Sequence, residues 1–146
     1  MAAAEPAQAV AERAGPVFML EIITPERRVL SEEVTSLVVP TADGYVGVLA
    51  HHAPMVAGVA IGVLRYRRDD AWHAVAVSGG FMEVADNRAV VLARTAELAG
   101  EIDVMRAEAA LQRARERLAD RSAGIDHTRA ENAMLRALAR IRAAGH

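Results

Sequence analysis

The chain has 146 residues, of which 53% are hydrophobic but only 3% aromatic, and its formal net charge is −2. This length suffices for one domain with a small appendage and a lean aliphatic core, and the near-balanced charge argues against a general nucleic-acid binder. The absence of cysteine excludes disulfides, thiolate nucleophiles and Cys-ligated zinc, and the absence of lysine excludes a phosphate-binding P-loop.

Residues 1–16 are predicted to be a flexible N-terminal extension. This segment contains Glu5 and Glu12, has no apolar signal-peptide core, and lacks the Arg-rich, acid-poor composition of a transit peptide. No apolar run in the sequence approaches the ~20 residues that a membrane-spanning helix needs.

Residues 17–98 are predicted to form an antiparallel β-sandwich or barrel. Short β-branched or alternating runs follow one another without an intervening helical pattern, which argues against a βαβ sheet. Thr-Pro, Ala-Asp-Gly, Arg-Asp-Asp, Gly-Gly and Asp-Asn supply the turn signals. The runs are VFMLEII, SLVVPT, YVGVLA, GVLRYRR, WHAVAVS, FMEVAD and RAVVLAR.

Two motifs in this segment have the composition of functional sites. His51 and His52 are adjacent, so their rings point to opposite sides of an extended chain, which favours surface or interface packing over metal binding. Ser78-Gly79-Gly80 is followed by another strand rather than a helix, so we interpret it as a hairpin or a bulge, not as a phosphate loop. No nucleophile elbow or suitably paired carboxylates accompany them, and the sequence therefore predicts no catalytic site.

Residues 99–146 are predicted to form a helical hairpin, because Ala, Glu, Arg and Leu dominate after Glu97. The pattern Ile-Asp-x-x-Arg-Ala occurs at Ile102 and again at Ile125, which places an Asp at the N-cap of each helix. The linker at 121–124 is too short for anything but antiparallel neighbours.

Each predicted helix carries an apolar stripe and a row of arginines about 120° away from it, at about 100° per residue. In an antiparallel pair of like helices, a two-fold axis places both arginine rows on the same broad side. The stripes are Ala107, Leu111, Ala114 and Leu118 on the first helix, and Ala130, Met134, Ala137 and Ile141 on the second. The rows are Arg106, Arg113 and Arg117, and Arg129, Arg136 and Arg140.

This geometry brings Arg106 opposite Arg140, and Arg113 near Arg136. Asp103 and Glu116 relieve the repulsion between these cations only in part, because neither arginine of the second helix has an acid three or four residues away. Two interpretations remain open: a solvated face, which a duplicated helix would also produce, or a binding site for a polyanion such as a phosphate chain.

Three motifs in order resemble a known family: GYVGVLAHHAPM, VAVSGGFMEV and IDVMRA. Together they resemble the epsilon subunit of the rotary (F-type) proton-translocating ATP synthase, of the bacterial, ATP-binding type. The resemblance covers nearly everything after the N-terminal extension, and it implies an α+β fold with an N-terminal flattened antiparallel β-sandwich and a C-terminal antiparallel two-helix hairpin. One departure is His51, which stands where the family normally has Gly.

The resemblance also implies a non-catalytic, regulatory role. The sandwich would bind the gamma subunit of the central stalk and sit on the c-ring, on the cytoplasmic face of the bacterial membrane. The hairpin would either fold against the sandwich, a state that ATP stabilises, or extend along gamma to the catalytic beta subunits and block ATP hydrolysis. Arg115, Arg117 and Arg121 would then meet an acidic segment of the beta subunits.

The family's ATP-binding pattern implies a site on the hairpin and no metal-ligating residue. Its arginines would bind the phosphates of unhydrolysed ATP, and Glu97, Asp103 and the close-packing Ala107 would lie at the adenosine end. The positions that match the pattern are Glu97, Asp103, Arg106, Ala107, Arg113, Arg136 and Arg140.

Two alternatives stay open from the sequence. One is a purely structural stalk connector whose hairpin binds no nucleotide and whose arginines contact only protein. The other is an unrelated β-sandwich adaptor with a helical tail, which would not associate with gamma.

Overall fold

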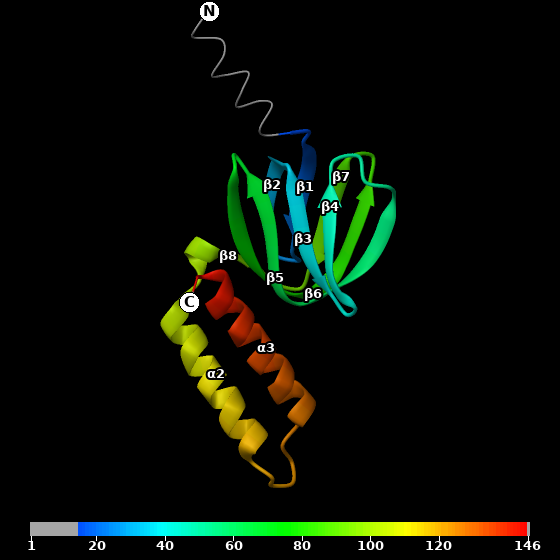
Figure 1. Cartoon of the computed structure of the whole chain (residues 1–146). Helices are drawn as coiled ribbons and strands as arrows, with labels where there is room; N and C mark the ends of the chain where they lie inside the picture. The colour runs from blue at the N-terminus through cyan, green and yellow to red at the C-terminus, as the bar shows by residue number, and fades with distance from the viewer. Residues whose placement is uncertain (1–14, 146) are drawn as a thin grey trace, which may run out of the picture.

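The computed structural model describes residues 15–145, in which a strand-rich domain is followed by two helices (Figure 1). The strands are β1 (Phe18–Ile23), β2 (Arg28–Val34), β3 (Ser36–Thr41), β4 (Gly44–Leu49), β5 (Met55–Arg68), β6 (Ala71–Ala85), β7 (Arg88–Ala93) and β8 (Ala96–Leu98). A short 3₁₀ helix, η1 (Ala99–Glu101), leads to α2 (Val104–Ala119) and α3 (His127–Ala143). The predicted α+β fold is confirmed; of the predicted N-terminal extension, residues 1–14 lie outside the described residues.

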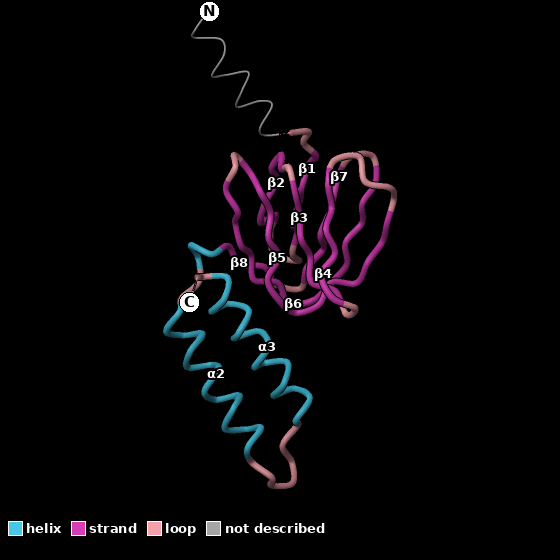
Figure 2. Tube along the Cα trace, viewed as in Figure 1, coloured by secondary structure: helices cyan, strands magenta, loops and turns pink. Residues whose placement is uncertain are grey.

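The strands form one hydrogen-bonded sheet in the order β2-β1-β7-β6-β5-β3-β4, with β8 added alongside β6. This sheet curls over on itself to give the predicted sandwich (Figure 2). All pairs are antiparallel except β1 with β7, which run parallel. That pair joins strands far apart in the chain, so the connection between them is long enough for a parallel arrangement.

The core lies between the two layers and is aliphatic, as the composition predicts. Its largest fully buried side chains include Leu20, Leu37, Leu64 and Met82. Inward and outward positions alternate along the strands; in β7, for example, Val91 is buried and Leu92 is exposed. This alternation is the period-2 pattern from which the strands were predicted.

Two predicted turns are tight hairpins in which both central residues have positive φ. Asp69 and Asp70 join β5 to β6 with φ of 51° and 60°, and Asp86 and Asn87 join β6 to β7 with φ of 52° and 57°. Asp and Asn tolerate this left-handed region because their side chains hydrogen-bond locally, and such turns match the strand twist.

The Ser78-Gly79-Gly80 segment lies inside one continuous strand, β6, so the interpretation as a hairpin is wrong. The register with β5 is the same on both sides, from Val59 opposite Gly80 to Ile61 opposite Ser78, so no residue is inserted and the interpretation as a bulge is also wrong. Gly79 and Gly80 have φ of 84° and 137°, which bends β6 as it leaves β7 and joins β8. The runs WHAVAVS and FMEVAD are therefore one bent strand.

His51 has a φ of 61°, a conformation that glycine adopts without strain. Its backbone N–H donates to the Asn87 Oδ1 atom at 2.8 Å, and the Asn87 side-chain amide donates to the Val17 carbonyl at 3.0 Å. The loop before β5 is thus tied to the β6–β7 turn and to the start of β1 through Asn87.

We expect His51→Gly to stabilise the protein by up to about 1 kcal/mol, because the left-handed strain disappears while the backbone bond to Asn87 is kept. Urea unfolding monitored by circular dichroism measures this change. His52→Gly is the matched control and should destabilise, since its φ is not in the left-handed region. A lower unfolding midpoint for His51→Gly than for the natural sequence would contradict the expectation.

The helical hairpin matches its prediction. The carboxylates of Asp103 and Asp126 cap α2 and α3 by accepting from the backbone N–H of Arg106 (3.1 Å) and Arg129 (3.0 Å). The alanines of the predicted stripes are buried, and the larger side chains beside them are half-buried. The buried members of the seam are Ala107, Ala114, Ala130 and Ala137.

Helix α3 has a second packed face that the sequence analysis did not identify. Ala139 and Ala143 form a small apolar cluster with Val63 of β5 and Ala76 of β6. The helix therefore packs on the sandwich with one face and on α2 with the other, and the hairpin is folded against the sandwich (Figure 1).

Candidate functional site

The two predicted arginines of α3 lie at the junction between the hairpin and the sandwich. Arg140 donates from Nε to the Glu97 Oε1 atom of β8 at 2.6 Å, and these side chains are 34% and 32% exposed. Residues 43 positions apart are therefore joined across the junction. This ion pair directly connects the two parts of the molecule.

Arg136 lines a small gap between α3 and the bent strand β6. Ser78 and Thr95 line the same gap, and their hydroxyls hydrogen-bond to each other at 2.5 Å. Ala76, Val77, Glu97, Ala139 and Arg140 complete the lining of this gap. Two hydroxyls thus lie beside the arginines of α3, a setting in which anion oxygens find both charge and hydrogen-bond donors.

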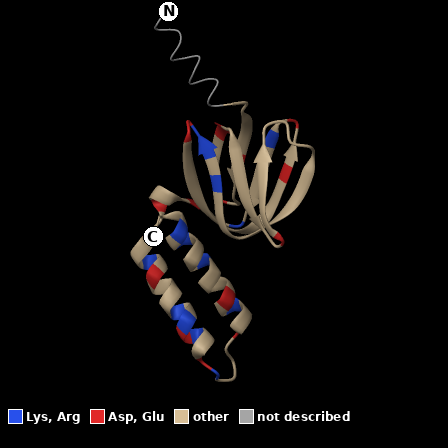
Figure 3. Cartoon of the chain, in the orientation of Figure 1, with Lys and Arg blue, Asp and Glu red and all other residues tan. Residues whose placement is uncertain are grey.

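Arg106 and Arg113 of α2 are exposed, and neither forms an ion pair among residues 15–145. Asp103, the acid nearest to Arg106 in the sequence, accepts from the backbone instead, and Glu116 accepts from the Gln112 side chain at 3.2 Å. The acids that the sequence places near these arginines therefore form no ion pair with either of them among residues 15–145. Figure 3 shows that basic and acidic residues both occur along the two helices.

Ala107 is only 3% exposed because it lies in the seam between α2 and α3. Its side chain packs on α3, as expected of a residue that lets the helices approach closely. Asp103 lies at the start of the same helix, one turn before Ala107. The burial of Ala107, Ala114, Ala130 and Ala137 agrees with the predicted apolar stripes, and the shared side of the two arginine rows stays a prediction.

The structure thus brings Glu97, Arg136 and Arg140 together, and places Asp103, Arg106 and Arg113 along α2. Sequence reasoning missed Ser78 and Thr95. The sequence does contain a signal for the second packed face of α3, because the residues that form this face recur with helical spacing. They are Asn132, Arg136, Ala139 and Ala143.

A larger open groove, of about 980 Å³, continues from this junction along the sandwich. Its floor is mostly apolar and comes from the ends of β1 and β7 and from the middle of β5 and β6, and its outer wall comes from α3. Among the lining residues are Ile61, Phe81, Leu92, Arg94, Asn132 and Arg136.

The histidine pair lies in the loop between β4 and β5. The His52 Nδ1 atom lies 2.7 Å from the Ala53 carbonyl oxygen, and His51 is exposed. No three His, Asp or Glu side chains within 15–145 are grouped so that they could hold a metal ion. None of the helices in the described part of the chain is long and apolar enough to cross a membrane.

Two family profiles match the chain in succession. Residues 17–99 match the beta-sandwich domain of the ATP synthase delta/epsilon chain, and residues 101–145 match its long alpha-helix domain. The first match ends and the second begins between the sandwich and the hairpin.

Relatives of similar length share much of the sequence. The chain is 58% identical over 127 residues to the ATP synthase epsilon chain of Symbiobacterium thermophilum, covering 86% of this chain and 91% of that protein. It is 52% identical over 127 residues to the epsilon chain of Syntrophomonas wolfei, covering 86% and 93%.

Solved structures agree on the fold. One is a chain in the structure of OSCP, F1 and c-ring of the Euglena gracilis mitochondrial ATP synthase, which superposes with a TM-score of 0.77 at 26% sequence identity. The superposition covers 89% of this chain and 82% of the Euglena chain. A chain of the Tetrahymena thermophila central stalk and c-ring gives a TM-score of 0.52 at 13% identity, over 85% and 90%, and supports the fold alone.

Proposed function

Since this chain belongs to the ATP synthase delta/epsilon family, as a non-catalytic epsilon subunit of the F-type enzyme, we propose that its hairpin inhibits ATP hydrolysis when it opens and that bound ATP holds it closed. The cluster of four arginines that the sequence predicts on one side of the hairpin carries this proposal. Of its four members Arg140 is paired with Glu97, whereas the other three form no ion pair within 15–145. They are Arg106, Arg113 and Arg136.

The chemistry of this cluster fits a triphosphate. Guanidinium groups match phosphate oxygens in geometry, and charge-assisted hydrogen bonds are roughly twice as strong as neutral ones. The arginines of both helices and Glu97 of the sandwich would all contact one ATP molecule. A ligand that spans these elements binds the closed form and not the open one, and so it favours closure.

The closed form is held by few contacts, which suits a reversible switch. The apolar contact between hairpin and sandwich consists of small residues, namely Val63, Ala76, Ala139 and Ala143. The Glu97–Arg140 pair is about one-third exposed, so solvent screening keeps its contribution near or below about 1 kcal/mol. ATP at ten times its Kd would add ~1.4 kcal/mol, which is comparable to these terms.

Within the complex, the sandwich would bind gamma and rest on the c-ring, and the open hairpin would reach the catalytic beta subunits through Arg115, Arg117 and Arg121. The assembly of OSCP, F1 and c-ring that contains the Euglena gracilis neighbour supports this placement. The chain would then be a peripheral subunit at the cytoplasmic face of the membrane.

Isothermal titration of the full chain with ATP, with and without magnesium, tests the ligand. We expect saturable binding with a stoichiometry of one. The absence of saturable binding up to millimolar ATP would remove the ATP switch and leave a purely structural connector, which is the second candidate function.

The inhibitory role has a separate test, because the chain contains no cysteine and a pair can be introduced cleanly. Ala76→Cys with Ala139→Cys places thiols on β6 and α3, in the cluster that joins sandwich and hairpin. When the pair is oxidised, we expect ATP hydrolysis by the reconstituted complex to be uninhibited, and reduction should restore inhibition. Either single variant is the control, and inhibition that persists with the hairpin locked would contradict the proposal.

A further inference from the structure

The groove beside α3 is polar where it meets the junction between the hairpin and the sandwich. Ser78, Thr95 and Arg136 line both this groove and the small gap between α3 and β6, so they mark the place where the two meet. Arg94 and Asn132 add a guanidinium group and a side-chain amide to the groove lining. We call Ser78, Arg94, Thr95, Asn132 and Arg136 the junction cluster.

The junction cluster carries positive charge that no acid in the groove neutralises. Neither Arg94 nor Arg136 forms an ion pair among residues 15–145. Of the described residues that line the groove, none is an Asp or a Glu. Glu97, which lines the adjoining gap, is bonded to Arg140. Two cations beside a groove without acids attract an anion.

Backbone hydrogen bonds hold the sandwich side of the junction cluster in place. The Ser78 N–H donates to the Thr95 carbonyl at 3.1 Å, and the Arg94 N–H donates to the Gly79 carbonyl at 3.0 Å. The hydroxyls of Ser78 and Thr95 lie 2.5 Å apart, and the bond between them uses only one of their two hydrogens. The other hydroxyl hydrogen remains available to an anion.

The hairpin side of the junction cluster comes from α3. Asn132 and Arg136 occupy positions i and i+4 of this helix, so they lie on one helix face. Because α3 supplies them, the complete cluster exists only while the hairpin is folded against the sandwich. An anion that contacts both sides therefore binds the closed form more tightly than the open form and shifts the hairpin toward closure.

A phosphate group fits this combination of donors better than a carboxylate does. A carboxylate has two oxygens, whereas a phosphate presents three or more and carries up to about two negative charges near neutral pH. It can accept from two guanidinium groups, a hydroxyl and an amide at once, and guanidinium groups match phosphate oxygens in geometry.

We propose that the junction cluster binds a phosphate group, and that Arg94 is the cation that the sandwich contributes to it. Two sources have this chemistry: free orthophosphate, and the terminal phosphate of ATP. The inference rests on the proposed function for the second source only. In that case Arg94 would extend the ATP site from the hairpin onto the sandwich and would help to distinguish ATP from ADP.

Isothermal titration of the full chain with ATP, ADP and orthophosphate tests the site and separates its sources. Arg94→Ala is expected to weaken binding of the phosphate source about tenfold, because it removes a hydrogen bond between charged groups. If ATP is the source, ADP binding should weaken by less than about threefold. If free phosphate is the source, orthophosphate itself should bind saturably and lose the same factor.

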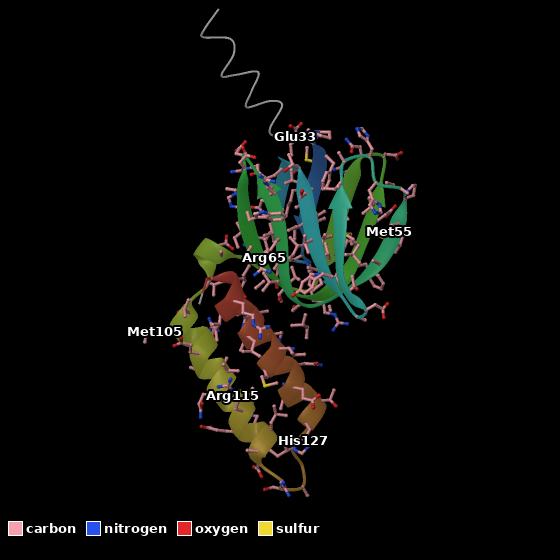
Figure 4. The ribbon with its side chains drawn as sticks, viewed as in Figure 1. Glu33, Met55, Arg65, Met105, Arg115 and His127 are labelled. Atoms are coloured by element: carbon pink, nitrogen blue, oxygen red, sulfur yellow. The ribbon has the colours of Figure 1, made fainter. Side chains whose placement is uncertain are left out.

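A matched control is available on the sandwich. Arg65 is an exposed arginine of β5 that forms no ion pair in the described part of the chain and does not line the groove (Figure 4). Arg65→Ala therefore removes the same charge from the same domain, and it should leave the affinity for all three ligands near that of the natural sequence.

Three further variants test the hydroxyl and the α3 side. Thr95→Val removes a hydroxyl at nearly constant shape and should weaken binding several-fold. Asn132→Glu places a carboxylate beside the phosphate and should weaken binding about tenfold or more by repulsion, whereas Asn132→Gln keeps the amide and should bind nearly as well as the natural sequence. Thermal unfolding verifies that each variant is folded.

The outcomes separate this inference from the proposed function. If orthophosphate binds through Arg94 but ATP does not bind, the ATP switch fails and the phosphate site stands. If ATP binds, orthophosphate does not, and Arg94→Ala weakens ATP no more than Arg65→Ala or no more than it weakens ADP, the ATP switch stands and the phosphate site is overturned. If Asn132→Glu is without effect, α3 takes no part and the coupling to closure is overturned.

Discussion

Replacing Arg106 or Arg140 with alanine is expected to weaken ATP binding by about 10-fold to 100-fold, because each change removes a hydrogen bond to a charged group worth about 1.5–3 kcal/mol. Arg106 has no ion-pair partner among the described residues, so its loss should affect ATP binding without weakening the ligand-free closed form. Isothermal titration gives the affinity, and thermal unfolding without ATP gives the stability.

The Arg140→Ala variant should differ in one respect. Arg140 also forms the bond to Glu97 across the junction, so its removal leaves that carboxylate unpaired and weakens closure even without nucleotide. The two variants should therefore show similar losses of ATP affinity but different hairpin positions in the ligand-free state. Distance measurements between spin labels on α3 and β6 would show this difference.

Matched controls exist on both helices. Arg115 lies about 180° around α2 from Arg106, and Arg142 lies about 160° around α3 from Arg140, at about 100° per residue. Arg115→Ala and Arg142→Ala remove the same charge from the opposite side of the hairpin. The ATP affinity of these two control variants should stay near that of the natural sequence. If the control variants lose as much ATP affinity as Arg106→Ala and Arg140→Ala, the arginines act only through net charge.

Gly80→Ala is expected to destabilise the sandwich by about 4 kcal/mol or more, the range of severe backbone and packing defects. An added Cβ atom would lie 1.9 Å from the Leu92 carbonyl oxygen and 2.9 Å from the Ala93 Cα atom, both of which belong to the backbone of β7. The φ of 137° is also one that only glycine adopts readily. Strand β7 would have to move away from β6.

Urea unfolding measures this loss, with Gly58→Ala as the control. Gly58 lies on β5 opposite Phe81, has no atom within 4 Å of an added Cβ, and has an ordinary φ. Its substitution should change the free energy of unfolding by less than about 1 kcal/mol. Similar unfolding midpoints for the two variants would show that the bend in β6 does not depend on Gly80.

The two largest expected effects are connected through the bend in β6. Ser78, next to this bend, lines the gap beside α3 together with Thr95 and Arg136, and the bend lies where β6 leaves β7 and joins β8.

Much of the fold was predictable because its determinants are local. The Asp-Asp and Asp-Asn turns, the two Asp N-caps and the alanine seam each depend on residues within a few positions of one another along one element or turn. The bent strand β6 was misread because a Gly-Gly pair between two apolar runs is also typical of a turn. Only the pairing with β5, whose register is unchanged through this point, separates the two arrangements.

The sequence by itself determined most of the strands and the helical hairpin with its alanine seam, since hydrophobic periodicity and capping act over one or two turns of chain. It missed the strands β2 and β8. Only the tertiary structure decided that α3 packs on the sandwich, that Arg140 reaches Glu97, and that an apolar groove with unpaired arginines runs beside it. These features join residues from distant segments, and their free energies depend on how whole elements pack, which no local pattern encodes.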